Sequence, residues 1–303
     1  MANSMAGKTV LVTGASSGIG KEAASQLAGL EASVIMACRS RERGEQARRE
    51  ILARYPGSDL QVLSIDLSSQ ASIYGFAEQV NTYFKRLDVL IHNAANFDLT
   101  LKKPFLTEDG VETIFATNHI GPFLLTRLLL DLLKASTPSR IITVASKGLM
   151  VYPNLDIEFD NLNGERKFSA QHAYYHSKLA QIMFTYDLAE SLEGTGVTVN
   201  CIQVPSVAVP DERLAELPGF LKKLYSLKRS MMSIPPARMA ETYVFLASDP
   251  AAGQVSGKLW DENNRQVKSN RNSYDRETWK KLWQASEKML ITRESLNDRS
   301  ERK

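Results

Sequence analysis

The stretch "VLVTGASSGIGKEAA", residues 10–24, joins a short apolar run to a helical pattern through Gly14, Gly18 and Gly20. The apolar run predicts a buried strand, and the residues after the glycines predict a helix. Glycine lets such a turn tighten and lets the backbone approach a pyrophosphate on the helix N-terminus, where free N–H groups favour negative charge. Because the glycines follow a strand and open a helix, the context is that of a dinucleotide-binding turn.

The same strand-then-helix pattern continues along the chain. Apolar runs rich in Val and Ile occupy residues 8–13, 32–37, 60–66, 87–93, 139–146 and 197–204, and helical patterns occupy 18–29, 41–54, 70–85, 107–135 and 170–192. Near-continuous apolar strands are typical of parallel sheets that are buried on both faces. Repeated strand–helix units imply right-handed crossovers and a doubly wound sheet of about seven strands. We therefore expect a single α/β domain over residues 1–303.

The pattern changes after residue 204. A Pro-rich segment with a mixed apolar and basic helical pattern at 219–229 is followed by a short helix at 236–249. Residues 256–260, "SGKLW", predict an edge strand. The charged tail from 286 onward is expected to fray.

Composition limits the function classes. The chain has 43% hydrophobic and 23% charged residues and a net charge of +3 that is scattered, which disfavours nucleic-acid binding. Cys38 and Cys201 lie in apolar runs and predict reduced core residues. The first ten residues lack the apolar stretch of a signal peptide, and segment 120–133 is too short to span a bilayer. We expect a cytoplasmic protein without an integral membrane segment.

Further motifs follow the glycine turn in a fixed order. They are "HNAAN" (92–96), "TNHIGPF" (117–123), "TVASKG" (143–148) and Tyr174-x-x-x-Lys178. With the G-x3-G-x-G turn, this set resembles the short-chain dehydrogenase/reductase family over residues 8 to about 265. "DIEFDNLN" (156–163), "SGKLW" and residues 277–289 are similar to its retinol dehydrogenase-like branch. The resemblance implies a Rossmann-type oxidoreductase domain with a nicotinamide cofactor.

The cofactor preference is predicted from the end of the second strand. Arg39 stands about 20 residues after the last glycine, where an NAD-selective fold places an acidic residue. An arginine there can hold a 2′-phosphate, and Ser40 can add a hydroxyl contact, so we expect NADP(H). By resemblance, Asp66 and Leu67 contact the adenine and Asn93 lines the cofactor cleft; a helix cap is the alternative for Asp66. The expected cofactor-binding residues are Gly14, Ser16, Ser17, Gly18, Ile19, Gly20, Arg39, Asp66, Leu67, Asn93, Ala94, Tyr174, Lys178, Pro205 and Val207.

Two adjacent tyrosines compete for the acid/base role. A free tyrosine has a pKa of about 10, and a nearby ammonium or an oxidised nicotinamide ring would favour the phenolate. On a helix, Tyr174 is offset from Lys178 by about 40° and Tyr175 by about 60° on the other side, so geometry leaves both open. The resemblance selects Tyr174 and makes Tyr175 a packing or substrate-wall residue.

The resemblance assigns three further roles. Ser146, at the carboxyl end of the fifth strand, binds the substrate oxygen, and Lys178 bonds the nicotinamide ribose. Asn118 holds a water that connects Lys178 to solvent; its poor helix propensity allows a plain helix irregularity as the alternative. The catalytic set is therefore Asn118, Ser146, Tyr174 and Lys178, with no metal.

The sequence departs from the family pattern after the sixth strand. Ser206 replaces the usual glycine and Pro210 the usual threonine, while Ala95 replaces a glycine in the asparagine motif. Residues 206–233 predict a substrate lid with an apolar face and a basic face, which favours a hydrophobic substrate. An alternative is that this segment rests on an anionic membrane.

These features predict an NADP(H)-dependent enzyme that transfers a hydride to or from the carbonyl or alcohol of a hydrophobic small molecule. One alternative is reduction of a C=C bond, as in the similar protochlorophyllide reductase group. Another is a non-catalytic nucleotide-sensing scaffold, which the presence of all four catalytic residues disfavours. By analogy with relatives, a homodimer could form through 107–135 and 170–192.

Overall fold

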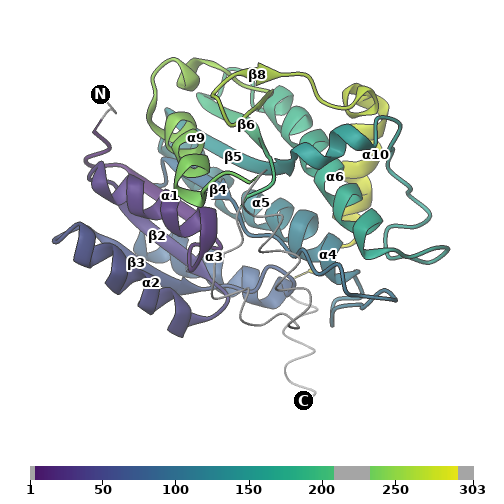
Figure 1. Cartoon of the computed structure of the whole chain (residues 1–303), viewed down its shortest axis with the longest axis horizontal. Coiled ribbons are helices and arrows are strands. Elements are labelled where there is room, and N and C mark those ends of the chain that lie inside the picture. Colours follow the sequence, from purple (N-terminus) through teal and green to yellow (C-terminus); the bar gives the residue numbers. More distant parts are fainter. Residues whose placement is uncertain (1–3, 208–232, 293–303) are drawn as a thin grey trace.

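The computed structural model describes residues 4–207 and 233–292, which form one α/β domain around an eight-stranded sheet (Figure 1). The strand order is β3-β2-β1-β4-β5-β6-β7-β8, with β7 and β8 antiparallel and the other neighbours parallel. The strands are β1 (Thr9–Thr13), β2 (Ser33–Cys38), β3 (Leu60–Ser64), β4 (Val89–His92), β5 (Ser139–Ser146), β6 (Val197–Val204), β7 (Lys258–Trp260) and β8 (Gln266–Val267). The predicted doubly wound sheet is confirmed.

Helices cover both faces of this sheet. One face carries α1 (Gly18–Gly29), α2 (Arg41–Arg54) and α9 (Pro236–Ser248), and the other carries α3 (Gln70–Tyr83), α5 (Gly121–Ala135) and α6 (Ala170–Ser191). Figure 1 shows α1 beside α9, and α10 (Arg276–Lys288) beside α6. Because α10 covers part of α6 within the same chain, pairing through α6 stays a prediction.

The strands read as continuous apolar runs because both of their faces are buried. In β1, Val10 and Val12 join the core under α1 and α9, while Leu11 between them joins the core under α3 and α5. Successive side chains of a strand point to opposite faces, so a sheet between two helix layers needs apolar residues at every position. This arrangement fixes the strands and leaves their carboxyl ends free to form a site.

The helix predicted at 107–135 is wrong in its first part. Leu106 and Glu112 form an antiparallel bridge around a turn in which Gly110 has φ of 78°. The helix starts at α4 (Thr113–Phe115), where the Glu112 carboxylate accepts the amides of Ile114 and Phe115 at 3.0 and 2.9 Å. A π-helical turn, η1 (Ala116–Ile120), separates α4 from α5. The turn at Gly110 and the Glu112 cap therefore start the helix at Thr113, although the apolar pattern predicted a start at 107.

Two predictions near the C-terminus are also corrected. Strand β7 is not the sheet edge, because the two-residue β8 pairs with it. The chain does not fray at 286: α10 continues to Lys288, and Ser286 is buried. The Gln70 side chain then donates to the Met289 carbonyl and accepts from the Ile291 amide, both at 2.8 Å. These bonds tie the described end of the chain to α3.

Cys38 and Cys201 are buried free thiols, as predicted for core residues. Among the helices of residues 4–207 and 233–292, none combines the length and apolarity that crossing a membrane requires.

Candidate functional site

The predicted site residues gather at one edge of the sheet. Parallel strands place their carboxyl ends together, and the order reverses between β1 and β4, where doubly wound sheets bind ligands. Figure 1 shows the sheet and the helices that flank it. The residues at or just after these carboxyl ends are Gly14 (β1), Arg39 (β2), Asp66 (β3), Asn93 (β4), Ser146 (β5) and Pro205 (β6).

The glycine turn has the backbone that the sequence predicts. Gly14 and Gly18 have φ of 68° and 58°, in the left-handed region that favours glycine. A Cβ on Gly14 would lie 2.9 Å from the Ala94 Cα, and one on Gly20 would lie 2.5 Å from the Gly14 carbonyl oxygen. The Ser17 side chain does not cap the first turn of α1. The turn therefore fits a pyrophosphate, whose oxygens would accept the uncapped N–H groups at Gly18, Ile19 and Gly20.

Asn93 supports this turn with its side chain. Its amide nitrogen donates to the Thr13 carbonyl at 2.9 Å, and its amide oxygen accepts from the Tyr243 hydroxyl at 3.2 Å. The Ala94 amide donates to the Thr13 hydroxyl at 3.1 Å. These bonds fasten the end of β4 to the end of β1, so Asn93 shapes the crevice. The sequence did not single out Tyr243, because it comes from α9, far along the chain.

At the adenosine end of the predicted cleft, the side chains of Arg39 and Asp66 have different surroundings. Arg39 is exposed directly after β2, and within the described residues it has no ion pair. Its guanidinium is therefore available for an anion. Asp66 instead accepts from the Ser68 amide at 2.9 Å and from the Ser68 hydroxyl at 2.6 Å. Asp66 thus forms a local turn, and the cap of α3 is Ser69, so the alternative of Asp66 as the helix cap is wrong.

Leu67 and Ser16 are two further residues that were predicted to bind the cofactor. Leu67 is buried, and a Cβ on Gly121 would meet its carbonyl oxygen, so the loop after β3 packs tightly on the start of α5. The Ser16 side chain interacts with the Cys38 thiol; burial raises the pKa of this thiol to about 11 and the contact offsets part of that rise. The thiol is therefore protonated and belongs to the core.

Lys178 lies beneath the ring of Tyr174. Its ammonium is 5.7 Å from the ring centroid and donates to the Val144 carbonyl at 2.9 Å. Lys178 is buried, and burial lowers the pKa of its amine to about 8. Near neutral pH the Lys178 amine therefore keeps most of its positive charge. This charge lies next to the ring of Tyr174, the tyrosine predicted to act with it.

The Tyr174 phenol lies beside Ser146. Burial raises the pKa of Tyr174 to about 12, and the hydrogen bond with the Ser146 side chain offsets part of this rise. Ser146 also accepts from the Gly148 amide at 3.2 Å, which orients its hydroxyl. In the protein alone the phenol is therefore held in its protonated form. The expected shift of this pKa toward neutrality is not produced by Lys178 by itself.

Tyr175 has different neighbours. Its ring pairs with Tyr152 at 4.8 Å between centroids, and a Cβ on Gly148 would lie 2.5 Å from its hydroxyl oxygen. Tyr175 therefore packs against the segment after β5. This matches the packing or wall role given to it, and the Ser146 contact is made by Tyr174.

Asn118 sits in the π-helical turn, so the predicted helix irregularity is present, and its catalytic role stays a prediction. Asn118 is 2% exposed, and its side chain binds both backbone groups of Asn96: the Asn96 amide donates to it at 2.6 Å, and it donates to the Asn96 carbonyl at 3.0 Å. It also donates to the Ser177 hydroxyl at 3.0 Å, which in turn donates to the Tyr174 carbonyl at 2.7 Å. The Asn118 side chain therefore clamps the loop after β4 to α6. π-turns often mark functional sites.

One aromatic residue at this site was missed by the sequence analysis. The Phe97 ring meets the Tyr174 ring edge-on, with centroids 4.5 Å apart and planes at 68°. Phe97 comes directly after the "HNAAN" motif, but no spacing rule connects it to residue 174. The Asn118 side chain holds the backbone of the preceding residue, Asn96, and this tertiary contact has no signal in the sequence.

The segment after β6 is described up to Val207. Val207 forms a parallel bridge with Ile234, and the Ile234 amide donates to the Ser206 carbonyl at 3.1 Å. Pro205 and Val207 thus follow β6 at the carboxyl edge of the sheet, and their contacts with a cofactor stay a prediction. Pro210 and most of the expected lid, residues 208–232, lie outside the described residues.

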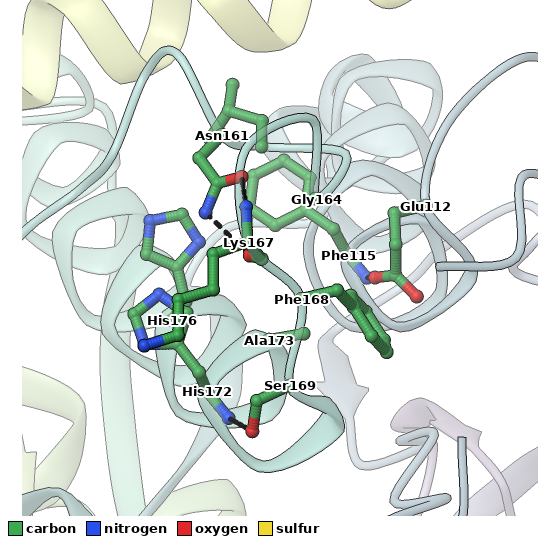
Figure 2. Close-up of a pocket in the computed structure, with 11 residues that line it drawn as sticks. Glu112, Phe115, Asn161, Gly164, Lys167, Phe168, Ser169, His172, Ala173 and His176 are labelled. Carbon is green, nitrogen blue, oxygen red and sulfur yellow. Dashed lines mark hydrogen bonds between the residues drawn. The ribbon is translucent and has the colours of Figure 1, made fainter. Parts of the chain in front are cut away.

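A separate pocket lies at the segment between β5 and α6, where residues 161–169 form part of its lining (Figure 2). The Asn161 side chain holds this segment by donating to the Lys167 carbonyl and accepting from the Arg166 amide, both at 3.0 Å. The pocket is lined by Glu112, Phe115, Asn161, Leu162, Gly164, Lys167, Phe168, Ser169, His172, Ala173 and His176. None of the predicted catalytic residues lines it, so it is distinct from the Tyr174 site. Among the described residues, no three His, Cys, Asp or Glu side chains are placed to hold a metal ion.

The sequence matches the family model described as short chain dehydrogenase over residues 8–156. It is 41% identical over 299 residues to human retinol dehydrogenase 14, covering 94% of this chain and 87% of that protein. It is 37% identical over 291 residues to human retinol dehydrogenase 13, covering 94% and 85%.

Solved structures have the same fold. An uncharacterized protein from Mycobacterium paratuberculosis superposes with a TM-score of 0.70 at 27% identity, covering 95% of each chain. A Beutenbergia cavernae protein, assigned as an NAD(P)-dependent gluconate 5-dehydrogenase and solved with bound NADP at low occupancy, superposes with a TM-score of 0.66 at 25% identity. It covers 86% of this chain and 96% of its own.

Proposed function

The chain belongs to the short-chain dehydrogenase family, in its retinol dehydrogenase-like branch, and from this premise we propose that it is an NADP(H)-dependent oxidoreductase of hydrophobic carbonyl and alcohol compounds. The observation that carries the proposal is the meeting of Tyr174, Ser146 and Lys178 at the sheet edge that also holds the glycine turn. A proton donor, an oxygen-binding hydroxyl and a buried cation are the groups that carbonyl reduction needs.

Tyr174 is the acid/base in this proposal. A bound nicotinamide cofactor supplies the hydride in one direction and accepts it in the other. Because burial keeps the phenol protonated, with a pKa of about 12, Tyr174 is prepared to give its proton to a carbonyl oxygen. Ser146 donates to the same oxygen and orients it.

Lys178 supports the step electrostatically. Its buried ammonium, held by the Val144 carbonyl, lies 5.7 Å from the Tyr174 ring centroid. When Tyr174 has given up its proton, this positive charge stabilises the phenolate in a site with little water. The charge is most effective below about pH 8, the pKa of the Lys178 amine.

The NADP(H) preference rests on Arg39. Its exposed guanidinium lies just after β2 at the adenosine end of the crevice and has no ion pair among the described residues. A guanidinium binds a phosphate through charge-assisted, bidentate hydrogen bonds. The Beutenbergia structure with bound NADP is consistent with this preference in a relative of the same fold.

The hydrophobic substrate class rests on exposed apolar side chains in the segments after β4 and β5. Phe97 contacts the Tyr174 ring, and Met150 and Val151 lie in the turn that follows Ser146. Retinol, which the names of the curated relatives carry, is itself a hydrophobic alcohol. Both observations support a bulky apolar substrate.

The test is NADPH consumption over a panel of hydrophobic aldehydes, ketones and enones. Tyr174→Phe removes the transferable proton and should lower kcat at least about 100-fold. Tyr175→Phe, one residue away, is the matched control and should keep most of the activity. Loss in Tyr175→Phe with retention in Tyr174→Phe would overturn the assignment. Turnover of enones alone would favour C=C reduction.

A further inference from the structure

The ring of Phe97 covers one side of Tyr174. The two rings meet edge-on at 4.5 Å, yet Phe97 remains 48% exposed. A phenylalanine that covers the phenol with part of its ring leaves the rest of its apolar surface open to solvent. Burial of that open surface by a ligand would be favourable by about 25 cal/mol for each Å².

The position of Phe97 is fixed by its backbone neighbours. The Asn118 side chain binds both the amide and the carbonyl of Asn96, at 2.6 and 3.0 Å. The Asp98 amide then donates to the Asn96 side chain at 3.1 Å, and the Thr100 amide donates to the Asp98 carboxylate at 2.9 Å. Successive side-chain turns hold the loop backbone on both sides of Phe97, and the ring itself packs edge-on against Tyr174.

Tyr175 is a second aromatic neighbour of Tyr174, and further apolar side chains are exposed in the turn after β5. The Tyr175 ring lies 5.3 Å from the Tyr174 ring, and Met150 and Val151, in the turn just after Ser146, are 68% and 71% exposed. The phenol therefore lies between aromatic neighbours from the loop after β4 and from α6. An apolar group attached to a carbonyl carbon at the phenol would lie close to the Phe97 ring, which is the more exposed of these neighbours.

We propose that Phe97 is a positioning and specificity residue of this site: its ring binds the apolar group next to the substrate carbonyl and keeps water away from the Tyr174 phenol. The inference rests on the proposed function. It adds that Phe97 makes the site prefer substrates with a large apolar group next to the carbonyl. Phe97 acts on the substrate by direct contact and on the phenol by excluding solvent.

The experiment compares the wild type with Phe97→Ala on two aldehydes of equal carbonyl reactivity, decanal and butanal. Loss of one apolar wall should lower kcat/KM for decanal about 10-fold, mainly through KM, and change butanal less than twofold. Phe97→Leu keeps an apolar wall and should recover most of the decanal preference. Phe105→Ala, which removes a 65% exposed phenylalanine from the same loop, is the matched control and should match the wild type.

The split between KM and kcat gives a readout that a purely structural role would not move. Loss of a wall that binds the apolar group should raise KM for decanal and leave kcat near the wild-type value. A general disturbance of the site would instead lower kcat for both aldehydes.

Binding separates this inference from the proposed function. Calorimetry of decanol binding to the full chain should give a dissociation constant about 10-fold weaker in Phe97→Ala than in the wild type. A wild type that reduces no carbonyl but binds decanol in a Phe97-dependent way would overturn the proposed function and keep this inference. Equal decanol binding and an unchanged decanal-to-butanal ratio in Phe97→Ala would overturn the inference.

Discussion

Tyr174 and Tyr175 are neighbours in the chain, but their environments give them different chemistry. Tyr174 contacts Ser146 and Phe97, whereas Tyr175 packs on Tyr152 and Gly148. Helix periodicity could not separate them, because both lie within one turn of Lys178. The separation comes from the segments after β4 and β5, so it is a tertiary property. Family resemblance selected Tyr174, and the Ser146 contact agrees with that choice.

The cofactor prediction is tested at one residue. In Arg39→Asp an exposed cation after β2 becomes an anion, which repels a 2′-phosphate and can accept hydrogen bonds from ribose hydroxyls. We expect the ratio of kcat/KM for NADPH over NADH to fall at least about 10-fold, a change of about 1.4 kcal/mol. Steady-state kinetics with both cofactors measure it. An unchanged ratio would contradict a 2′-phosphate role; Arg41→Asp, in the next helix, is the control for loss of local charge.

Among the secondary-structure elements, two helices contain glycines with opposite surroundings. A Cβ on Gly20, in α1, would meet the Asn93 amide and lie 2.5 Å from the Gly14 carbonyl oxygen, whereas one on Gly75, in α3, would meet nothing within 4 Å. Gly20→Ala should therefore destabilise the fold and weaken NADPH binding. Gly75→Ala should raise the free energy of unfolding by about 0.5–1 kcal/mol, because alanine has the higher helix propensity.

Urea unfolding and a fluorescence titration with NADPH measure both variants. Equal behaviour of Gly20→Ala and Gly75→Ala would show that the close approach of α1 to the glycine turn does not matter.

Most of the elements could be predicted, and the failures have local causes. The strand ranges 139–146 and 197–204 and the helix ranges 18–29 and 41–54 agree with the structure, because periodicity and glycine punctuation both mark them. The start of the 107–135 helix was wrong because the Glu112 cap and the turn at Gly110 interrupt an amphipathic pattern. The π-turn around Asn118 has no periodic signal, and its clamp on Asn96 links segments about 20 residues apart.

At the scale of the whole molecule, the two edges of the sheet have different roles. The carboxyl edge carries the site, while Asp88 stands just before β4 at the amino edge. Asp88 is buried and accepts from the Thr9 amide at 2.9 Å, from Lys8 at 2.9 Å and from Arg86 at 2.6 and 2.7 Å. This carboxylate joins β1 to β4 at the end away from the chemistry.

Asp88→Asn should therefore lower stability and leave catalysis unchanged. Burial alone would raise the pKa of Asp88, but the bonds from Arg86, Thr9 and Lys8 outweigh it and hold the pKa below its usual value. A lowered folded-state pKa means that the stabilisation is present above the unfolded value of about 3.9 and is lost as the pH falls through the lower folded value.

Urea unfolding at pH 7 should show a loss of about 2 kcal/mol in Asp88→Asn, and the difference from the wild type should shrink at pH 3. The kcat of the folded variant should equal that of the wild type. A variant that keeps full stability at pH 7, or one that loses turnover while folded, would contradict this division between the two edges.

The bridge between Val207 and Ile234 has a consequence for engineering. Val207 and Ile234, which stand on either side of residues 208–232 in the sequence, are held next to each other by that bridge and by the bond from the Ile234 amide to the Ser206 carbonyl. Ends that are already adjacent make a change of loop length inexpensive, since closure entropy grows only slowly with length. We therefore expect the sheet to keep its register when the sequence between these two anchors is replaced by its counterpart from another short-chain dehydrogenase. If that sequence is the predicted substrate lid, the exchange should alter ligand preference.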